Sequence, residues 1–448
     1  MKTKTQNRII VNKFGGGILT QKFILLIKKQ IKEQIENGFY PIVVISALNG
    51  VTDILENLLL YKKNKEIEKK SIEKIRTKHI KMINFVKMDK KNQQIAITEI
   101  DNLLKNLEID FQKIRKFNSL DIFRDKILSY GEKMSTIFFT EFLNSSNLFS
   151  QKLFAENIPI ITDDNYLNAN IDYKISAKNI RAKLKNIKSI PVIAGFTGIT
   201  KNNRTTILGR GGTDTTACFV GAAVKANKII LWKDVNGVLS ADPRIVKNTK
   251  TVSCLSYIEA EEAGKIIHNK AMQYVEKTRT TVEVASIINY NNKTLIKADS
   301  SKQKGAKIIG FKKGLAMIIV SGNGINEHGF LFEISKILNL LALNMVLIRN
   351  TRDSLQIVVG SRNKNLKKAI KEIKKKNCKI SASPVNMVML IGNLDWKTVS
   401  TFNNTLIKIC PDPQIGAFPY KNCARLEAIV KTDEMKKVMR GFHKIFIK

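Results

Sequence analysis

The feature that most constrains the fold of this chain is the stretch "YPIVVISAL" (40–48), which is apolar almost throughout. A strand with one face in water would alternate apolar and polar side chains, so this run predicts a strand covered on both faces. A shorter apolar run, 9–11, precedes it. Between the two, "QKFILLIKKQIKEQIENG" (21–38) has apolar residues at helical spacing and ends on a glycine. The order strand, helix, strand predicts a mainly parallel sheet in a three-layer α/β/α sandwich.

The rest of the chain divides into further elements of the same kind and a different C-terminal part. Residues 61–120 are lysine-rich with apolar residues at helical spacing and predict a solvated helical insertion, and 121–145 predict a further helix. The stretches "IPVIAGFTGI" (190–199) and "KIILWKDVNGV" (228–238) predict two more buried strands. The polar, glycine-punctuated stretch "DSSKQKGAKIIGFKKG" (299–314) predicts a domain boundary. Beyond it, a β-α-β-β pattern is followed by a similar, rougher one, which indicates a weak internal repeat. We therefore predict a first domain at 1–305, followed by two α+β modules at 312–380 and 381–448.

Composition excludes several classes of protein. The chain has 448 residues, 44% of them hydrophobic, and no apolar stretch long enough to span a membrane. Its beginning lacks the apolar core of a signal peptide, so we expect a cytoplasmic protein with no membrane partner. Five scattered cysteines without a CxxC pair argue against a disulfide framework or a zinc site, and we predict no protein-built metal site.

The net charge is +38, from 76 Lys and Arg against 38 Asp and Glu. Such a charge first suggests a nucleic-acid partner. The lysines are, however, spread over the whole length beside many Ile and Asn, a drift that an AT-biased genome produces, and no nucleic-acid-binding motif accompanies them. We therefore predict no nucleic-acid partner, although the charge favours polyanionic ligands.

Three glycine-containing segments are candidates for binding chemistry. Lys13 stands just before Gly15, Gly16 and Gly17, a turn that can converge backbone amides and a lysine on a phosphate, or can simply be a turn after a strand.

In "LGRGGTDTT" (208–216), Arg210 and Asp214 flank glycines just before a helix, which fits either anion binding or a salt-bridged turn. The segment "WKDVNGVLSADPRI" (232–245) fits a nucleotide-contacting loop or a purely structural one.

Together, in this order, these segments resemble the aspartate kinases of the amino-acid kinase superfamily. The resemblance covers about residues 8–300, and the tail is similar, less closely, to the paired ACT regulatory domains of that family. The other stretches that carry it are "VVISALNGVTDIL" (43–55), "RDKILSYGEKMS" (124–135), "GFTGITKNNRTTILGRGGTDTTA" (195–217) and "KIIH" (265–268).

The resemblance implies transfer of the γ-phosphoryl group of ATP to the β-carboxylate of L-aspartate, which gives 4-phospho-L-aspartate. That is the first step of the diaminopimelate route to lysine, threonine and methionine. The resemblance also implies a monofunctional enzyme that forms a homodimer through its ACT-like modules. A carboxylate is already ionised at neutral pH, so the reaction needs positioning and charge neutralisation more than a general base.

The resemblance also assigns residues to roles. Lys13 and Asp214 would be catalytic, with Asp214 orienting Lys13 or the substrate amine. Arg210 would hold the α-carboxylate of aspartate and Glu132 its α-ammonium, and the rest of that pocket would be Ser46, Thr52, Phe196 and Thr213. The ATP-binding set, with Mg²⁺ carried on the nucleotide, would be Lys13, Gly15, Gly16, Lys233, Asp234, Leu239, Arg244 and Lys265.

Some positions depart from the family pattern. Relatives usually have Thr-Ser where Gly17 and Ile18 stand, so a hydroxyl near the phosphates is lost. They have Thr at the position of Lys233 and Tyr at that of Leu239. In the first ACT-like module, Leu347 stands where lysine-sensitive relatives have an Asp that receives the ammonium of the ligand. We therefore predict weakened inhibition by lysine, with a shift of the effector to threonine as the alternative.

Two other functions remain open at this stage. Another amino-acid kinase, acting on glutamate or a carbamate, would share the fold but would be expected to lack "SYGEK" and the double ACT tail. A catalytically weak regulatory protein with ACT modules would have no reason to keep Lys13 and Arg210.

Overall fold

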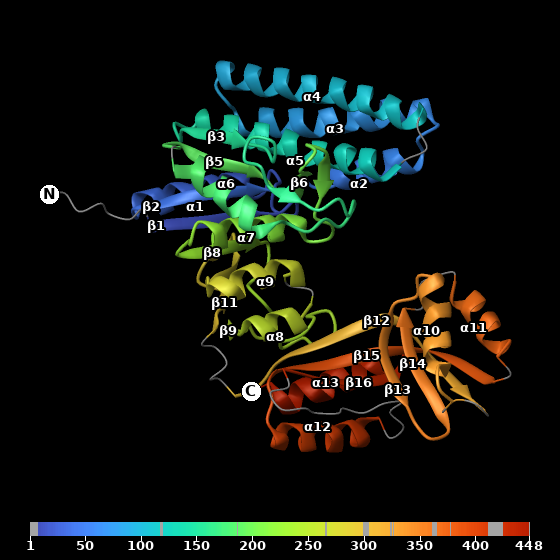
Figure 1. The fold of residues 1–448 in the computed structure, drawn as a ribbon. Coiled ribbons are helices and arrows are strands. Elements are labelled where there is room, and N and C mark those ends of the chain that lie inside the picture. The colour runs from blue at the N-terminus through green and yellow to red at the C-terminus, as the bar shows by residue number, and fades with distance from the viewer. Residues whose placement is uncertain are drawn as a thin grey trace. The chain divides into compact units, whose positions relative to one another are not determined.

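The computed structural model of the chain describes residues 8–116, 120–185, 187–264, 267–298, 304–322, 325, 327–360, 365–376, 378–410 and 424–447. The chain forms two compact units (Figure 1). The first consists of Met1–Val238 and Thr251–Ser300, and the second of Leu239–Lys250 and Ser301–Lys448.

The first unit is built on an eight-stranded sheet, in which every neighbouring pair of strands is parallel except β10 and β11. This confirms the prediction of a mainly parallel sheet. In spatial order the strands are β3 (Ser150–Leu153), β5 (Ile190–Ala194), β2 (Phe39–Ile45), β1 (Arg8–Phe14), β8 (Lys228–Lys233), β10 (Val282–Ser286), β11 (Lys293–Ile296) and β9 (Cys254–Leu255). A small separate sheet contains β4 (Ile161–Thr162), β6 (Thr197–Thr200) and β7 (Thr205–Ile207).

Helices cover both faces of the large sheet. On one face, α1 (Ile24–Glu36) and α5 (Leu120–Asn144) pack on the side chains of β1 and β2. On the other face lies α7 (Gly212–Ala223), which is buried along its whole length, with α6 (Tyr173–Lys185) and α9 (Asn269–Thr278) beside it. The unit also contains α2 (Val51–Leu60), α3 (Lys65–Val86), α4 (Lys90–Lys116) and α8 (Tyr257–Glu262).

The lysine-rich segment predicted to be a helical insertion forms α3 and α4, which run beside α5 (Figure 1). A buried carboxylate joins α4 to α5: Asp110 accepts a hydrogen bond of 2.6 Å from the hydroxyl of Tyr130 and lies 2.8 Å from the ammonium of Lys126. Since a buried charge is stable only when it is paired and hydrogen-bonded, this cluster fixes α4 against α5. The insertion thereby braces the helix that carries Glu132.

The second unit is an antiparallel sheet with helices, as expected for two ACT-like modules. Its strands lie in the order β13 (Met345–Asn350), β14 (Ser354–Gly360), β12 (Gly305–Ser321), β15 (Lys379–Asn393) and β16 (Arg425–Lys431). One core brings α10 (Phe330–Leu340) and α11 (Leu366–Lys374) onto β12 and β14, and another brings α12 (Trp396–Ile409) and α13 (Met435–Phe446) onto β15 and β16.

The limits of these parts differ from the expected ones in two respects. Strand β12 begins at Gly305, so the stretch expected between the first two domains is part of a strand, and β15 runs through the expected boundary at 380/381. The polar residues of 299–314 obscured the strand, whose Ile308 and Ile309 are buried.

The second difference is that 239–250 belongs to the second unit. Its Ala241, Ile245 and Val246 enter the core around α12 and α13. Ser240 Oγ also lies 2.9 Å from Nε2 of His443, and Arg440 donates to the carbonyl of Ile245. The apolar side chains of this loop therefore pack against residues more than a hundred positions later in the chain.

Within the described ranges, every helix is too short or too polar to cross a bilayer.

The two tryptophans of the chain give a test of the packing of the first unit. Trp232 on β8 is 1% exposed, stacks on Phe14, and donates from Nε1 to Oδ1 of Asn12 at 2.9 Å, whereas Trp396 on α12 is 74% exposed. Trp232→Phe removes buried volume and a buried hydrogen bond, and should destabilise the first unit by about 2 kcal/mol. Trp396→Phe should change stability by less than about 0.5 kcal/mol. Thermal unfolding followed by circular dichroism compares them, and equal midpoints for the two variants would contradict this packing.

Candidate active site

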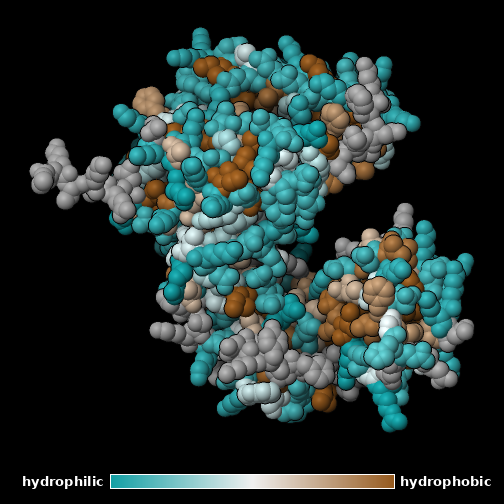
Figure 2. Space-filling model, viewed as in Figure 1, coloured by the Kyte–Doolittle hydropathy of each residue, from teal (hydrophilic) through white to brown (hydrophobic). Residues whose placement is uncertain are grey.

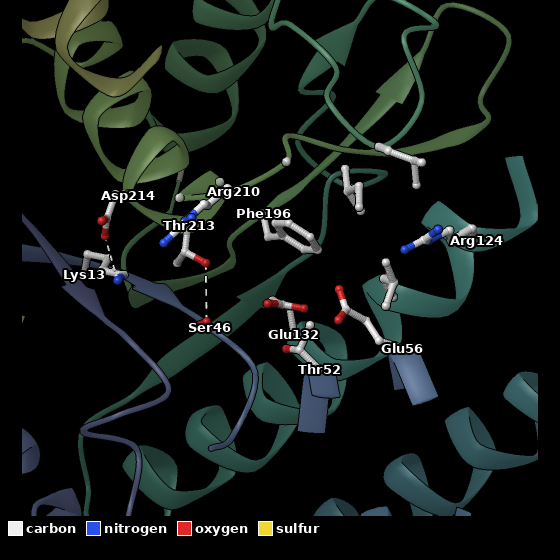
Figure 3. A pocket seen from close by; sticks show the side chains of 16 residues that line it. Lys13, Ser46, Thr52, Glu56, Arg124, Glu132, Phe196, Arg210, Thr213 and Asp214 are labelled. Atoms are coloured by element: carbon white, nitrogen blue, oxygen red, sulfur yellow. Dashed lines mark hydrogen bonds and ion pairs between the residues drawn. The ribbon is translucent and has the colours of Figure 1, made fainter. Parts of the chain in front are cut away.

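A cleft of about 530 Å³ lies in the first unit, where β1 and β2 end and α7 begins. In a parallel α/β sheet, ligands bind beyond the carboxyl ends of the strands, so the cleft has the expected place. Figure 3 shows Lys13 and Asp214 at one end of it, Arg124 and Glu56 at the other, and Phe196 and Glu132 between them.

The centre of charge in the cleft is an ion pair. Lys13 lies on β1, and its ammonium is 2.6 Å from Oδ1 of Asp214, in the first turn of α7; the two side chains are 9% and 10% exposed. Lys233, at the end of the neighbouring strand β8, is 3.8 Å from Oδ2 of the same carboxylate. Burial alone would raise the pKa of Asp214, but the two lysines outweigh it and hold that pKa below its usual value. Asp214 is therefore ionised at neutral pH.

The glycine turn after β1 leaves room for this lysine. A Cβ on Gly15 would lie 2.8 Å from Nζ of Lys13, and one on Gly16 would lie 2.8 Å from the carbonyl of Ala47. A side chain at Gly16 would collide with the backbone of the loop after β2, so that position requires glycine, whereas one at Gly15 would displace the ammonium of Lys13. Gly17 faces open space, and Ile18 is buried in the main core.

Glu132 is a second carboxyl group of the cleft. It lies on α5, is 3% exposed, and its Oε1 accepts a hydrogen bond of 3.2 Å from the backbone N–H of Ala47. Its Oε2 has no partner among the described residues. Burial raises the pKa of Glu132 to about 8, although the backbone hydrogen bonds partly oppose this. An ammonium group of a ligand would satisfy the free oxygen and stabilise the charged form.

The remaining predicted substrate residues also line the cleft. Thr213 donates to Ser46 across it at 3.4 Å, and Thr52 lies in the first turn of α2. Phe196 has a φ of 68°, which is uncommon for a bulky residue and is held in place by the bond from its N–H to Thr216. Arg210 is exposed at the mouth. The structure thus brings together Lys13, Ser46, Thr52, Glu132, Phe196, Arg210, Thr213 and Asp214.

The predicted ATP-binding residues are divided between the two units. Gly15, Gly16, Lys233 and Asp234 lie in the first unit, at or just after the ends of β1 and β8. Leu239 and Arg244 belong to the second unit, where Arg244 is exposed and forms an ion pair of 2.7 Å with Asp242. Lys265 lies outside the described residues.

Several lining residues escaped the sequence analysis, among them Glu56, Arg124 and Leu128. Helical spacing could have found them, because Glu56 is four residues after Thr52, and Arg124 and Leu128 are eight and four residues before Glu132. The backbone of this end is fixed by Asp125, which is fully buried and accepts from the N–H groups of Leu167 and Ile207.

Within the described residues, no group of three or more His, Cys, Asp or Glu side chains is placed to hold a metal ion.

Curated relatives of the chain are aspartokinases. The aspartokinase of Rickettsia prowazekii is 33% identical over 48% of this chain and 50% of its own length. Aspartokinase 1 of Bacillus subtilis is 29% identical over 67% of this chain and 63% of its own. The chain thus spans about half to two thirds of the length of these relatives.

Solved structures share its fold. Escherichia coli aspartokinase III in complex with lysine and aspartate has a TM-score of 0.83 at 22% identity, over 99% of this chain and 100% of that one. The same protein with aspartate and ADP has a TM-score of 0.81 at 21% identity, over 97% and 99%. The family model of the amino acid kinases matches residues 8–286, more than half of the chain. The chain belongs to the amino acid kinase family.

Proposed function

We propose that this protein is an aspartate kinase, which transfers the γ-phosphoryl group of ATP to the β-carboxylate of L-aspartate. The observation that carries the proposal is the order of charges along one cleft. A buried Lys13–Asp214 pair stands at one end, and the unpartnered carboxylate oxygen of Glu132 and the guanidinium of Arg210 line the same space. The family and the names of its relatives support the same activity.

These residues suit a zwitterionic substrate. Arg210 would bind the α-carboxylate through its two parallel N–H groups, and Glu132 would bind the α-ammonium. The β-carboxylate would then lie toward Lys13, whose ammonium offsets the repulsion between that carboxylate and the triphosphate. Because both reactants are anions, holding them in line and neutralising their charge would supply most of the rate enhancement.

The nucleotide would approach from the side of the glycine turn. Gly15 and Gly16 leave the backbone accessible beside Lys13, and the N-terminus of α7 offers N–H groups and a favourable dipole to an anion. Mg²⁺ would arrive bound to the triphosphate and screen its charge. In the structure of the Escherichia coli relative, ADP and aspartate are bound together. We expect the enzyme to act in the cytoplasm.

Purified protein with Mg-ATP tests the proposal directly. ADP release should require L-aspartate and should stay near background with L-glutamate or with no acceptor. Lys13→Ala removes one preorganised charge, and should lower the rate by roughly a hundredfold or more while the protein stays folded. Equal ADP release with and without L-aspartate, or a fully active Lys13→Ala variant, would contradict the proposal.

The buried carboxyl group of Glu132 predicts how aspartate binding depends on pH. Its pKa is raised to about 8, so below that pH the free protein holds Glu132 protonated and unable to pair with an ammonium. The KM for aspartate should therefore fall, on the order of tenfold, as pH rises from 6.5 to 8.5.

Glu132→Gln is the matched control, because it keeps the shape and cannot ionise. It should raise the KM for aspartate and remove this pH dependence, with the KM for ATP nearly unchanged. A pH dependence that persists in Glu132→Gln would assign the titration to another group.

Inhibition by lysine should be weak. Leu347 lies on β13, partly buried against the cluster that contains Leu315 and Met317, so an apolar side chain stands where an ammonium would need a carboxylate. Burying an ammonium without a partner is strongly unfavourable. Separate titrations of L-lysine and L-threonine into the assay should show little inhibition by millimolar lysine. Strong inhibition by lysine alone would show that another residue supplies the charge.

We also propose that the chain forms a homodimer through its first ACT-like module. Among the described strands, β13 is an edge of its sheet, and an edge strand can pair with a strand of another chain. Apolar side chains are exposed on β13 and the adjacent α10, among them Phe332 (66%) and Leu340 (75%). Figure 2 shows apolar side chains on this module, where Figure 1 places α10 and β13. A self-complementary pairing of two copies would cover both features. Sedimentation equilibrium measures the resulting mass.

A further inference from the structure

Lys233, which departs from the family pattern, lies beside Asp214. Lys233 is the last residue of β8, and β8 pairs in parallel with β1 so that Leu231 lies opposite Lys13. Side chains alternate between the faces of a strand, so Lys13, Leu231 and Lys233 project from the same face, toward α7. Asp214 on α7 lies between the two lysines, 2.6 Å from one and 3.8 Å from the other.

The summed charge of Lys13, Asp214 and Lys233 shows why Lys233 matters for nucleotide binding. A lone Lys13 paired with a buried Asp214 sums to zero charge, so the pair itself would add no net attraction for a triphosphate. If Lys13 turned to the phosphates instead, it would leave a buried carboxylate unpaired beside another anion, which is strongly unfavourable. With Lys233 the trio carries one net positive charge, and Asp214 keeps a counter-charge whichever lysine binds the nucleotide.

Resting on the proposed function, we propose that Lys233 is a positioning residue that neutralises Asp214 while Lys13 binds the phosphates of ATP. The side chain of Lys233 is 30% exposed, which gives it the freedom to close the gap of 3.8 Å when Lys13 moves away.

Calorimetric titration of Mg-ADP and Mg-ATP into the full-length chain tests this without any acceptor. Lys233→Met should weaken nucleotide binding about tenfold, and Lys233→Arg, which keeps the charge, should restore most of the affinity. Lys174→Met, which removes an exposed lysine of α6, is the control for loss of one positive charge and should bind as the wild type does. In steady-state kinetics, Lys233→Met should change the KM for ATP and leave the KM for aspartate within twofold.

A double-mutant cycle separates action through Asp214 from direct contact with the nucleotide. In an Asp214→Asn background there is no carboxylate to neutralise, so Lys233→Met should change nucleotide affinity by less than twofold. The same tenfold loss in that background, or wild-type affinity in the single variant, would overturn the inference. If the chain binds nucleotide but phosphorylates no aspartate, the proposed function is refuted. The titrations then still decide whether Lys233 acts through Asp214. A chain that binds no nucleotide would overturn both.

Discussion

The buried ion pair between Lys13 and Asp214 is the interaction on which the cleft depends. Its partners come from elements two hundred residues apart, and they meet because β1 lies beside β8 at the centre of a parallel sheet and α7 packs across both. A charged pair this deep is stable only when its geometry is fixed. Lys233 supplies a second positive charge 3.8 Å from Asp214, and Gly15 leaves room for the ammonium of Lys13. The buried charges are therefore held in a fixed arrangement that can bind an anion.

The fold was predictable wherever one local pattern decided the structure. The apolar run 40–48 required a strand covered on both faces, and β2 is such a strand, buried from its third residue to its end. The eight residues assigned to catalysis and substrate all line one cleft, because each sits in a motif whose position in the fold is fixed. The residues that sequence reasoning missed, such as Arg124 and Glu56, lie on the same helix faces as Glu132 and Thr52, so helical spacing from those two residues could have found them.

The second unit shows the limit of local reasoning in another way. The polar, glycine-punctuated stretch 299–314 suggested a domain boundary, yet Ile308 and Ile309 within it are buried in a strand that serves both modules. Likewise, the loop that carries Leu239 and Arg244 inserts Ala241 and Ile245 into a core formed by α12 and α13. Both outcomes depend on contacts between segments far apart in the chain, which composition along a short window does not contain.

The central claim is that this cleft directs a phosphoryl group to one particular carboxylate. The product, an acyl phosphate, reacts with hydroxylamine to give a stable hydroxamate, and mass spectrometry locates the modified carboxyl group. The account predicts that the full-length chain with Mg-ATP, L-aspartate and hydroxylamine forms the β-hydroxamate of aspartate and consumes one ATP for each. Formation of the α-hydroxamate, or ATP consumption with no hydroxamate, would contradict it.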